Sequence, residues 1–282
     1  ALESEVSAVI VRHSFTFTLL SLFLLTLSLF AFPLHANAET TLTVFAAASM
    51  TESMNMIAGS YKKSAPDVKI VYNFDSSGTL KTQIEQGAEC DIFISAGQKQ
   101  MDQIDIKADP KVNTKKLDLV LEGTRFNIVS NKVVMVVPKG HNPKGISDFR
   151  DAVTEKVFLI ALGNSDVPVG QYSEEIYKNL GLWDKLKSMN KISYASNVKE
   201  VLSQVAAGAV DCGIVYSTDA ATSKGVDVVA EAPKGSHKPI TYPAAILKKA
   251  KNPEAATSFV DFLKGPESSK IFNKIGFAVP TK

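Results

Sequence analysis

Short apolar runs alternate along the chain with segments in which apolar residues recur every three or four positions. Residues 42–45 form one such run, and within residues 50–64 the side chains of Met54, Ile57 and Tyr61 fall on one helical face. Short apolar runs are typical of buried strands, and the periodic segments are typical of amphipathic helices that cover them. The alternation predicts an α/β fold with a mainly parallel sheet that is flanked by helices.

The same alternation continues through the rest of the chain. We predict further strands over residues 69–74, 91–95, 132–138, 157–162, 192–195, 212–216, 226–230 and 241–247. We predict further helices over residues 79–86, 171–180, 198–207, 253–264 and 267–275. Residues 102–130 are more polar and irregular, and we expect a boundary between two lobes there.

A short internal similarity indicates that the two lobes have similar topology. Residues 83–88 (Gln-Ile-Glu-Gln-Gly-Ala) align with residues 204–209 (Gln-Val-Ala-Ala-Gly-Ala). Each segment is followed by a cysteine, Cys90 or Cys212, that opens an apolar strand. Ligands of parallel sheets bind beyond the carboxyl ends of the strands. If both lobes face one cleft, each cysteine lies roughly 15–20 Å behind it, because a strand rises about 3.3 Å per residue. A disulfide needs Cα atoms within about 7 Å, so we expect two separate buried thiols.

The first 38 residues differ from the rest of the chain. Arg12 and His13 precede an apolar run over residues 15–32, and the tripeptide Ala-Asn-Ala follows at 36–38. This order is typical of a secretory signal peptide, so we expect export to the periplasm with cleavage after Ala38. The alternative is an N-terminal membrane anchor, because the apolar run approaches spanning length.

Composition and charge exclude several classes of function. The 282-residue chain has 45% hydrophobic and 21% charged residues, as expected for a globular protein. Its formal net charge of +2 provides no basic field for nucleic acid. No Cys, His or carboxylate group has metal-ligand spacing, and we expect no cofactor. His141 and His237 lie in lysine-rich, turn-like stretches, where we expect exposed side chains.

Uncharged polar residues gather where the predicted strands end. They are Ser49, Ser76, Ser77, Ser95, Asn164, Ser165, Asn197, Tyr216, Ser217 and Thr218. At residues 46–49 three alanines and a serine connect a strand to a helix, which aims backbone N–H groups and a positive helix end at one place. For any one serine, helix capping is the alternative. Together these residues predict an anion site made of uncharged donors.

Six motifs resemble those of the periplasmic molybdate-binding proteins of ABC transporters. The motifs are Val-Phe-Ala-Ala-Ala-Ser at 44–49, Phe-Asp-Ser-Ser-Gly-Thr-Leu at 74–80, Asp-Ile-Phe-Ile-Ser-Ala at 91–96, Val-Pro-Val-Gly-x-Tyr at 167–172, Gly-Ile-Val-Tyr-Ser-Thr-Asp-Ala at 213–220 and Phe-Leu-Lys-Gly-Pro at 262–266. The resemblance implies a two-lobed, type II periplasmic-binding-protein fold with the ligand cleft between the lobes. We expect residues 39–125 and 240–282 in one lobe and residues 126–239 in the other.

The resemblance also implies a function and a set of ligand-binding residues. It implies a monomeric, exported receptor that captures molybdate or tungstate and delivers it to an ABC permease in the membrane, without enzymatic activity. Carried over by motif, the oxyanion would be held by the hydroxyl and backbone groups of Ser49 and Ser77, the backbone N–H groups of Val169 and Val198, and the hydroxyl of Tyr216.

Three positions depart from the family pattern. Gly78 replaces a further serine, and Val169 stands where alanine is usual. Asp75 stands where a neutral small residue is common, and its carboxylate would repel an anion if it faced the ligand. Asp75 is therefore the departure that bears most on the predicted site.

The chemistry of the ligand leaves two alternatives. A site of donors suits molybdate, whereas hydrogen phosphate would leave its proton unpaired, at a cost of about 1–3 kcal/mol. Sulfate or another tetrahedral oxyanion is the first alternative, because only cavity size separates sulfate from molybdate. An exported serine-dependent hydrolase is the second, although Ser49 has no candidate base in its own motif.

Overall fold

A computed structural model describes residues 39–280 of the chain. The predicted signal peptide and its cleavage after Ala38 lie outside the described residues. Within residues 39–280, no helix is both long enough and apolar enough to cross a bilayer.

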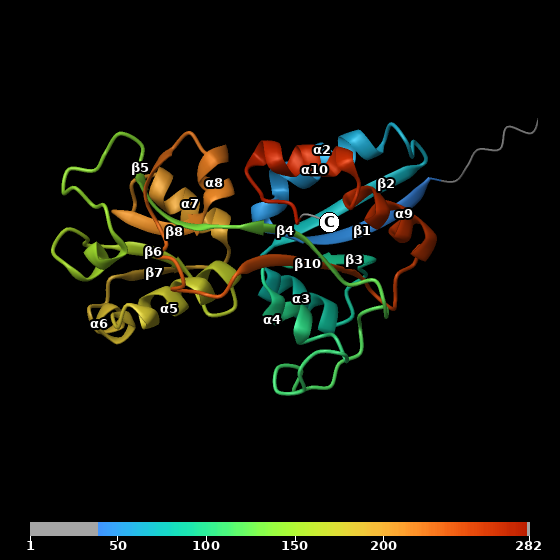
Figure 1. The fold of residues 1–282 in the computed structure, drawn as a ribbon, viewed down its shortest axis with the longest axis horizontal. Helices are drawn as coiled ribbons and strands as arrows, with labels where there is room; N and C mark the ends of the chain where they lie inside the picture. The colour runs from blue at the N-terminus through green and yellow to red at the C-terminus, as the bar shows by residue number, and fades with distance from the viewer. Residues whose placement is uncertain (1–38, 281–282) are drawn as a thin grey trace, which may run out of the picture. The chain divides into compact units, whose positions relative to one another are not determined.

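Residues 39–280 contain two five-stranded sheets (Figure 1). The first sheet has the strand order β2 (Val68–Asp75), β1 (Thr40–Ala47), β3 (Ile92–Ile94), β10 (Ile240–Ile246) and β4 (Phe126–Asn131). The second has the order β7 (Ile192–Ala195), β6 (Ile160–Gly163), β8 (Cys212–Tyr216), β5 (Val133–Pro138) and β9 (Val226–Glu231). We call each sheet with its helices the first or the second lobe. Strands β1, β2 and β3 occupy the same places as β6, β7 and β8, which confirms the predicted similarity of the two lobes.

Strand direction follows the same rule in both sheets. Strands β1, β2 and β3 are parallel, as are β6, β7 and β8. In contrast, β10 and β5 each pair antiparallel with both neighbours. Four strands of each sheet therefore share one direction, which confirms a mainly parallel sheet, while the antiparallel pairings were not predicted.

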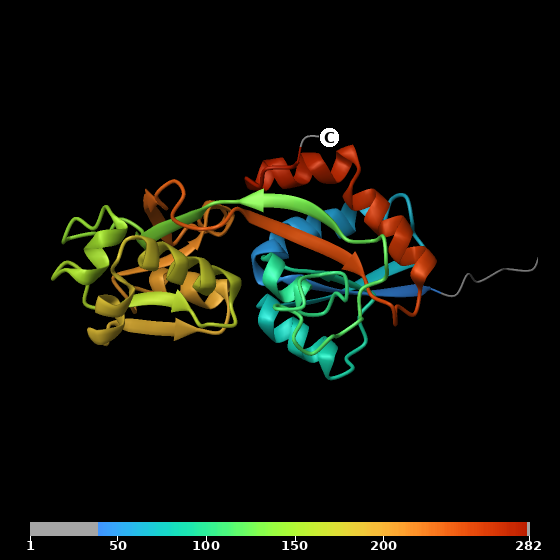
Figure 2. The same cartoon turned by 60° about the horizontal axis from the view of Figure 1, so that its bottom comes forward.

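The chain crosses between the lobes twice, as Figure 2 shows. Strand β4 leads directly into β5 through Lys132, and residues 232–239 connect β9 to β10. Strand β4 was not predicted, and its pairing with β10 makes it part of the first lobe. The first lobe therefore extends to Asn131, beyond the boundary expected after residue 125. The strand was missed because its polar residues leave neither a continuous apolar run nor a regular alternation.

Helices cover both faces of each sheet (Figure 1). In the first lobe they are α2 (Thr51–Tyr61), α9 (Pro253–Leu263) and α10 (Pro266–Ile275) on one face, and α3 (Ser77–Glu85) and α4 (Gln98–Asp102) on the other. In the second lobe they are α5 (Pro168–Asn179), α6 (Trp183–Ser188), α7 (Val198–Ala206) and α8 (Ser217–Thr222). The side chains of consecutive strand residues point to opposite faces of the sheet. Val44 packs in one hydrophobic cluster, and its neighbour Phe45 packs in another, with Leu80 of α3 and Met101 of α4. All predicted helices are present with slightly shifted ends, whereas α4, α6 and α8 were not predicted.

The two cysteines lie where the topology predicts. Cys212 opens β8 and Cys90 precedes β3, so each lies at the amino end of a strand whose carboxyl end faces the other lobe. Both are buried and neither forms a disulfide, which confirms the prediction of two separate thiols.

Candidate functional site

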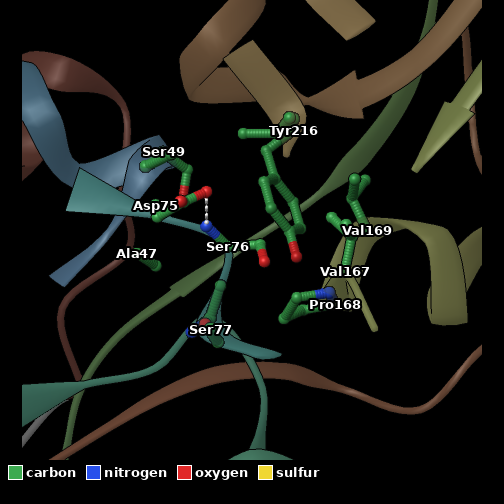
Figure 3. A pocket seen from close by; sticks show the side chains of 12 residues that line it. Ala47, Ser49, Asp75, Ser76, Ser77, Val167, Pro168, Val169 and Tyr216 are labelled. Atoms are coloured by element: carbon green, nitrogen blue, oxygen red, sulfur yellow. Dashed lines mark hydrogen bonds between the residues drawn. The ribbon is translucent and has the colours of Figure 1, made fainter. Parts of the chain in front are cut away.

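A small pocket lies where the carboxyl ends of strands from both sheets meet (Figure 3). The first lobe contributes Ala47, Ala48, Ser49, Asp75, Ser76, Ser77 and Ala96, and the second contributes Val167, Pro168, Val169, Val198 and Tyr216. The cavity volume is about 10 Å³, which is about the room that one water-sized group needs and too little for a sugar or a peptide. All five residues predicted for the site therefore line one pocket.

Three helices of at least nine residues begin at this pocket. Helix α3 begins at Ser77, α5 at Pro168 and α7 at Val198. The first N–H groups of a helix have no partner within it, and the helix dipole is positive at this end. The convergence of three such ends from two lobes makes the pocket favourable for an anion.

Side-chain caps leave the first N–H groups of two of these helices available. The Ser76 hydroxyl accepts from the N–H of Thr79 at 3.1 Å, and the Asn197 side chain accepts from the N–H of Glu200 at 3.0 Å. Each cap takes the N–H of the third helical residue. The backbone N–H groups of Val198, the first residue of α7, and of Ser77, the first residue of α3, are therefore available to a ligand.

The two predicted serines are buried and hydrogen-bonded within the first lobe. Ser49 lies in the 3₁₀ turn η2 (Ala48–Met50) after β1, and its Oγ is 3.0 Å from the hydroxyl of Tyr242. Ser77 is fully buried, and its Oγ accepts from the N–H of Ala96 at 2.9 Å. Among the described residues, neither serine is hydrogen-bonded to a His, Lys, Asp or Glu side chain.

Tyr216 supplies a hydroxyl from the second lobe. It ends β8, and Figure 3 shows its ring extending into the pocket. The ring is buried, and among the described residues its hydroxyl has no hydrogen-bond partner. Burial raises the pKa of Tyr216 well above its ordinary value, so the hydroxyl stays protonated. An unpaired buried hydroxyl is unfavourable, and an anion in the pocket would accept its hydrogen bond.

Asp75 lies in the pocket lining, at the place where the sequence raised the question of repulsion (Figure 3). Its Oδ1 accepts from the N–H of Ser76 at 2.7 Å and from the side-chain amide of Asn197 at 3.3 Å. These donors come from different lobes. The carboxylate therefore accepts the hydrogen bond of the Ser76 N–H, which would otherwise be available to a ligand at the start of α3.

Charged side chains connect the lobes beside the pocket. The Nζ of Lys199 in α7 lies 2.9 Å from each carboxylate oxygen of Glu52 in α2, and 3.0 Å from Oδ1 of Asp219 in α8. Asp219 is fully buried, and this burial raises the pKa of its carboxyl to about 6 although the Lys199 ammonium lowers it. Sequence reasoning missed this cluster, because its members are far apart in the chain and each reads as an ordinary surface charge.

Uncharged contacts also hold the lobes together. Gly78, at the start of α3, lies so close to Asp166 that an added Cβ would be 2.2 Å from the carbonyl oxygen of Asp166. The side-chain amide of Gln100 donates to Oε1 of Gln171 at 3.3 Å. The structure is therefore a closed arrangement of the lobes around the pocket.

Among the described residues, the pocket lining contains hydroxyl groups and N–H groups of helix starts, and it contains no histidine or cysteine. Among residues 39–280, no group of three or more His, Cys, Asp or Glu side chains could hold a metal ion.

Sequence reasoning also missed Tyr242, because a tyrosine in an apolar strand reads as a core residue. Its contact with Ser49 spans 193 positions, and no local pattern encodes it.

Comparison with known proteins places these features in a family. Residues 42–278 match the family model of the bacterial extracellular solute-binding proteins. The molybdate-binding protein ModA of Escherichia coli K12 is 40% identical over 259 residues, which cover 88% of this chain and 94% of that protein. The molybdate-binding protein ModA of Haemophilus influenzae is 35% identical over 244 residues, which cover 86% and 91%. The structure of the periplasmic molybdate-binding protein of Azotobacter vinelandii is 25% identical with a TM-score of 0.73, covering 85% of this chain and all of that chain.

Proposed function

Because the chain belongs to the family of bacterial extracellular solute-binding proteins, we propose that it captures molybdate and tungstate and delivers them to an ABC permease. The observation that carries the proposal is the pocket of uncharged donors from both lobes. These donors are the hydroxyls of Ser49, Ser77 and Tyr216 and the backbone N–H groups of Val169 and Val198. The likeness to the two ModA proteins supports molybdate as the ligand.

The chemistry of the pocket favours a fully deprotonated dianion. Among the described residues that line it, none has a cationic side chain. A fully deprotonated oxyanion accepts from every donor at once, whereas the proton of hydrogen phosphate would need an acceptor. The Asp75 carboxylate lies in the lining, but its Oδ1 already accepts from Ser76 and Asn197. A proton of hydrogen phosphate that points away from Asp75 stays unpaired, at a cost of about 1–3 kcal/mol.

Binding is coupled to closure of the lobes. Ser49 and Ser77 belong to the first lobe, and Val169, Val198 and Tyr216 belong to the second. An ion that bridges both sets interacts more strongly with the closed arrangement than with an open one, and it therefore shifts the population toward closure. The closed form is then the surface that the permease recognises.

Export, oligomeric state and the lack of a cofactor and of catalysis complete the proposal. Residues 1–38 direct export to the periplasm and are removed after Ala38, and the receptor acts as a monomer. We further propose that it needs no cofactor and has no catalytic activity; among the described residues, neither Ser49 nor Ser77 is hydrogen-bonded to a His, Lys, Asp or Glu side chain. The mass and N-terminal sequence of the exported protein test the cleavage, and its mass in solution tests the monomer.

Titration calorimetry with four oxyanions tests the proposed ligand. We expect molybdate and tungstate to bind with similar affinity and with one ion per chain, because they are nearly identical in size and charge. Phosphate should bind far more weakly. Tighter binding of sulfate than of molybdate would instead identify a sulfate receptor, and no heat with any of the four would overturn the proposal.

A further inference from the structure

The hydroxyl of Ser49 is one end of a chain of hydrogen bonds that reaches the first crossing between the lobes. Its Oγ is 3.0 Å from the hydroxyl of Tyr242, and that hydroxyl is 3.2 Å from Nδ2 of Asn131. Tyr242 is fully buried in β10, just after the second crossing. Asn131 is the last residue of β4, just before the first crossing.

The amide orientation of Asn131 follows from its neighbours. Its Oδ1 accepts from the backbone N–H of Lys132 at 2.9 Å and from the hydroxyl of Ser217 at 3.0 Å. A backbone N–H can only donate, so the atom that faces Lys132 must be the carbonyl oxygen. The NH₂ group therefore faces the other way and donates to Oγ1 of Thr218 at 2.9 Å and to the hydroxyl of Tyr242. Tyr242 is an acceptor in this bond.

One acceptor is then left for the hydroxyl hydrogen of Tyr242 among the described residues. Among the described residues, its hydrogen-bond partners are Asn131, which donates to it, and Ser49. A buried hydroxyl hydrogen without an acceptor is unfavourable, so Tyr242 donates to Ser49. Burial also raises the pKa of Tyr242 well above its ordinary value, so this hydrogen is retained.

The second serine of the pocket is oriented in the same sense. The N–H of Ala96 donates to Oγ of Ser77, so this hydroxyl also accepts from inside the first lobe. A hydroxyl that accepts from within the protein keeps its own hydrogen for the pocket. Ser49 and Ser77 are therefore both held as donors toward the position of the ligand.

We propose that Tyr242 and Asn131 are positioning residues that hold Ser49 as a hydrogen-bond donor, and that they thereby make the pocket selective for tetrahedral oxyanions without a proton. This inference rests on the proposed oxyanion-binding function and assigns its selectivity to residues outside the pocket lining. If Ser49 turned its hydrogen toward residue 242, a lone pair of its oxygen would face the ligand. That lone pair would accept the proton of hydrogen phosphate.

Tyr242→Phe is the first test. It keeps the ring that packs edge-on against Tyr216 and Phe277. It removes the hydroxyl that donates to Ser49 and accepts from Asn131. The measurement is the affinity for molybdate and for inorganic phosphate in weakly alkaline buffer, where both ligands are dianions and hydrogen phosphate carries one proton. We expect the ratio of molybdate to phosphate affinity to fall about tenfold or more, with molybdate binding weakened.

Asn131→Asp is the second test, and it reverses the direction of the hydrogen bonds from residue 131 through Tyr242 to Ser49. An aspartate accepts at both oxygens, so the Tyr242 hydroxyl turns to it and Ser49 must donate to Tyr242. The added charge weakens both dianions alike, so the affinity ratio isolates the change in hydrogen-bond direction. We expect this ratio to fall at least as far as in Tyr242→Phe. If Tyr242→Phe does not fold, the affinity ratio of Asn131→Asp tests the inference on its own.

Tyr61→Phe is the matched control, because it removes a tyrosine hydroxyl that bonds Ser258 away from the pocket. Its affinity ratio should equal that of the unmodified protein. If the unmodified protein binds molybdate and both test variants keep its ratio, the inference about Tyr242 and Asn131 is wrong and the proposed function stands. If the unmodified protein does not bind molybdate, the proposed function itself fails.

Discussion

Gly78 of the first lobe lies directly against the backbone carbonyl of Asp166 of the second, with no room for a Cβ between them. Gly78 is the second residue of α3, and Asp166 precedes α5, so this contact joins two of the helix ends that form the pocket. The glycine, a departure from the family pattern in the sequence, therefore allows the lobes to approach closely.

Gly78→Ala should separate ligand affinity from stability. The added methyl group overlaps the Asp166 carbonyl in the closed arrangement, so we expect molybdate affinity to fall about tenfold or more. The free energy of unfolding of the ligand-free protein should stay the same or rise by up to about 1 kcal/mol, because alanine favours a helix over glycine. Calorimetry and urea unfolding measure the two quantities.

Gly59→Ala is the control for this prediction. Gly59 lies within α2, and an added Cβ there would meet nothing within 4 Å. It should gain the same helix stability and leave molybdate affinity unchanged. Equal affinities of the two variants would contradict the role of the Gly78 contact in closure.

Asp75→Asn should increase molybdate affinity. Asparagine still accepts the bond from the N–H of Ser76, but it removes a negative charge from the pocket lining. Two unit charges about 4 Å apart repel by about 1 kcal/mol in water, and a dianion doubles this, so we expect binding about tenfold tighter or more. Asp184→Asn, which removes an exposed charge in α6, is the control and should leave the affinity unchanged. Equal or weaker binding by Asp75→Asn would show that the carboxylate does not oppose the ligand.

Asp219 should make stability depend on pH. Its carboxyl has an ordinary pKa of 3.8 and a folded-state pKa of about 6, so the folded protein binds this proton more tightly than the unfolded chain does. The resulting stabilisation is complete below about pH 4 and is lost as the pH rises through about 6. The loss is of order 1–3 kcal/mol.

Comparison with Asp219→Asn isolates this effect from the other carboxyl groups. The difference in unfolding free energy, unmodified protein minus variant, should fall between about pH 4 and pH 6 and stay constant above. Urea unfolding over this range measures it. A difference that is flat or rises with pH would contradict the raised pKa.

Local signals explain how much of this structure could be predicted. The apolar runs predicted every strand except β4, and the polar residues after strand ends predicted the pocket, because both features are written in consecutive residues. The resemblance to a known family selected five residues, three with hydroxyl groups and two in the first turn of a helix, and all five line the pocket.

Long-range pairings explain the rest. Strand β4 pairs with β10, more than a hundred positions away, and polar residues interrupt its apolar ones, so its own sequence reads as irregular. The hydrogen bond from Tyr242 to Ser49 and the ion pair of Lys199 with Glu52 likewise join distant positions. Periodicity carries no information on such contacts, and only the folded chain reveals them.

The central claim is that uncharged donors from both lobes hold an oxyanion, and Tyr216→Phe tests it most directly. The Tyr216 hydroxyl has no partner among the described residues, so its removal deletes a donor to the ligand and nothing else. Titration calorimetry should show molybdate binding about 10- to 100-fold weaker, since a hydrogen bond to a charged group contributes about 1.5–3 kcal/mol, with no loss of stability in the ligand-free protein. Unchanged molybdate affinity in this variant would contradict the account.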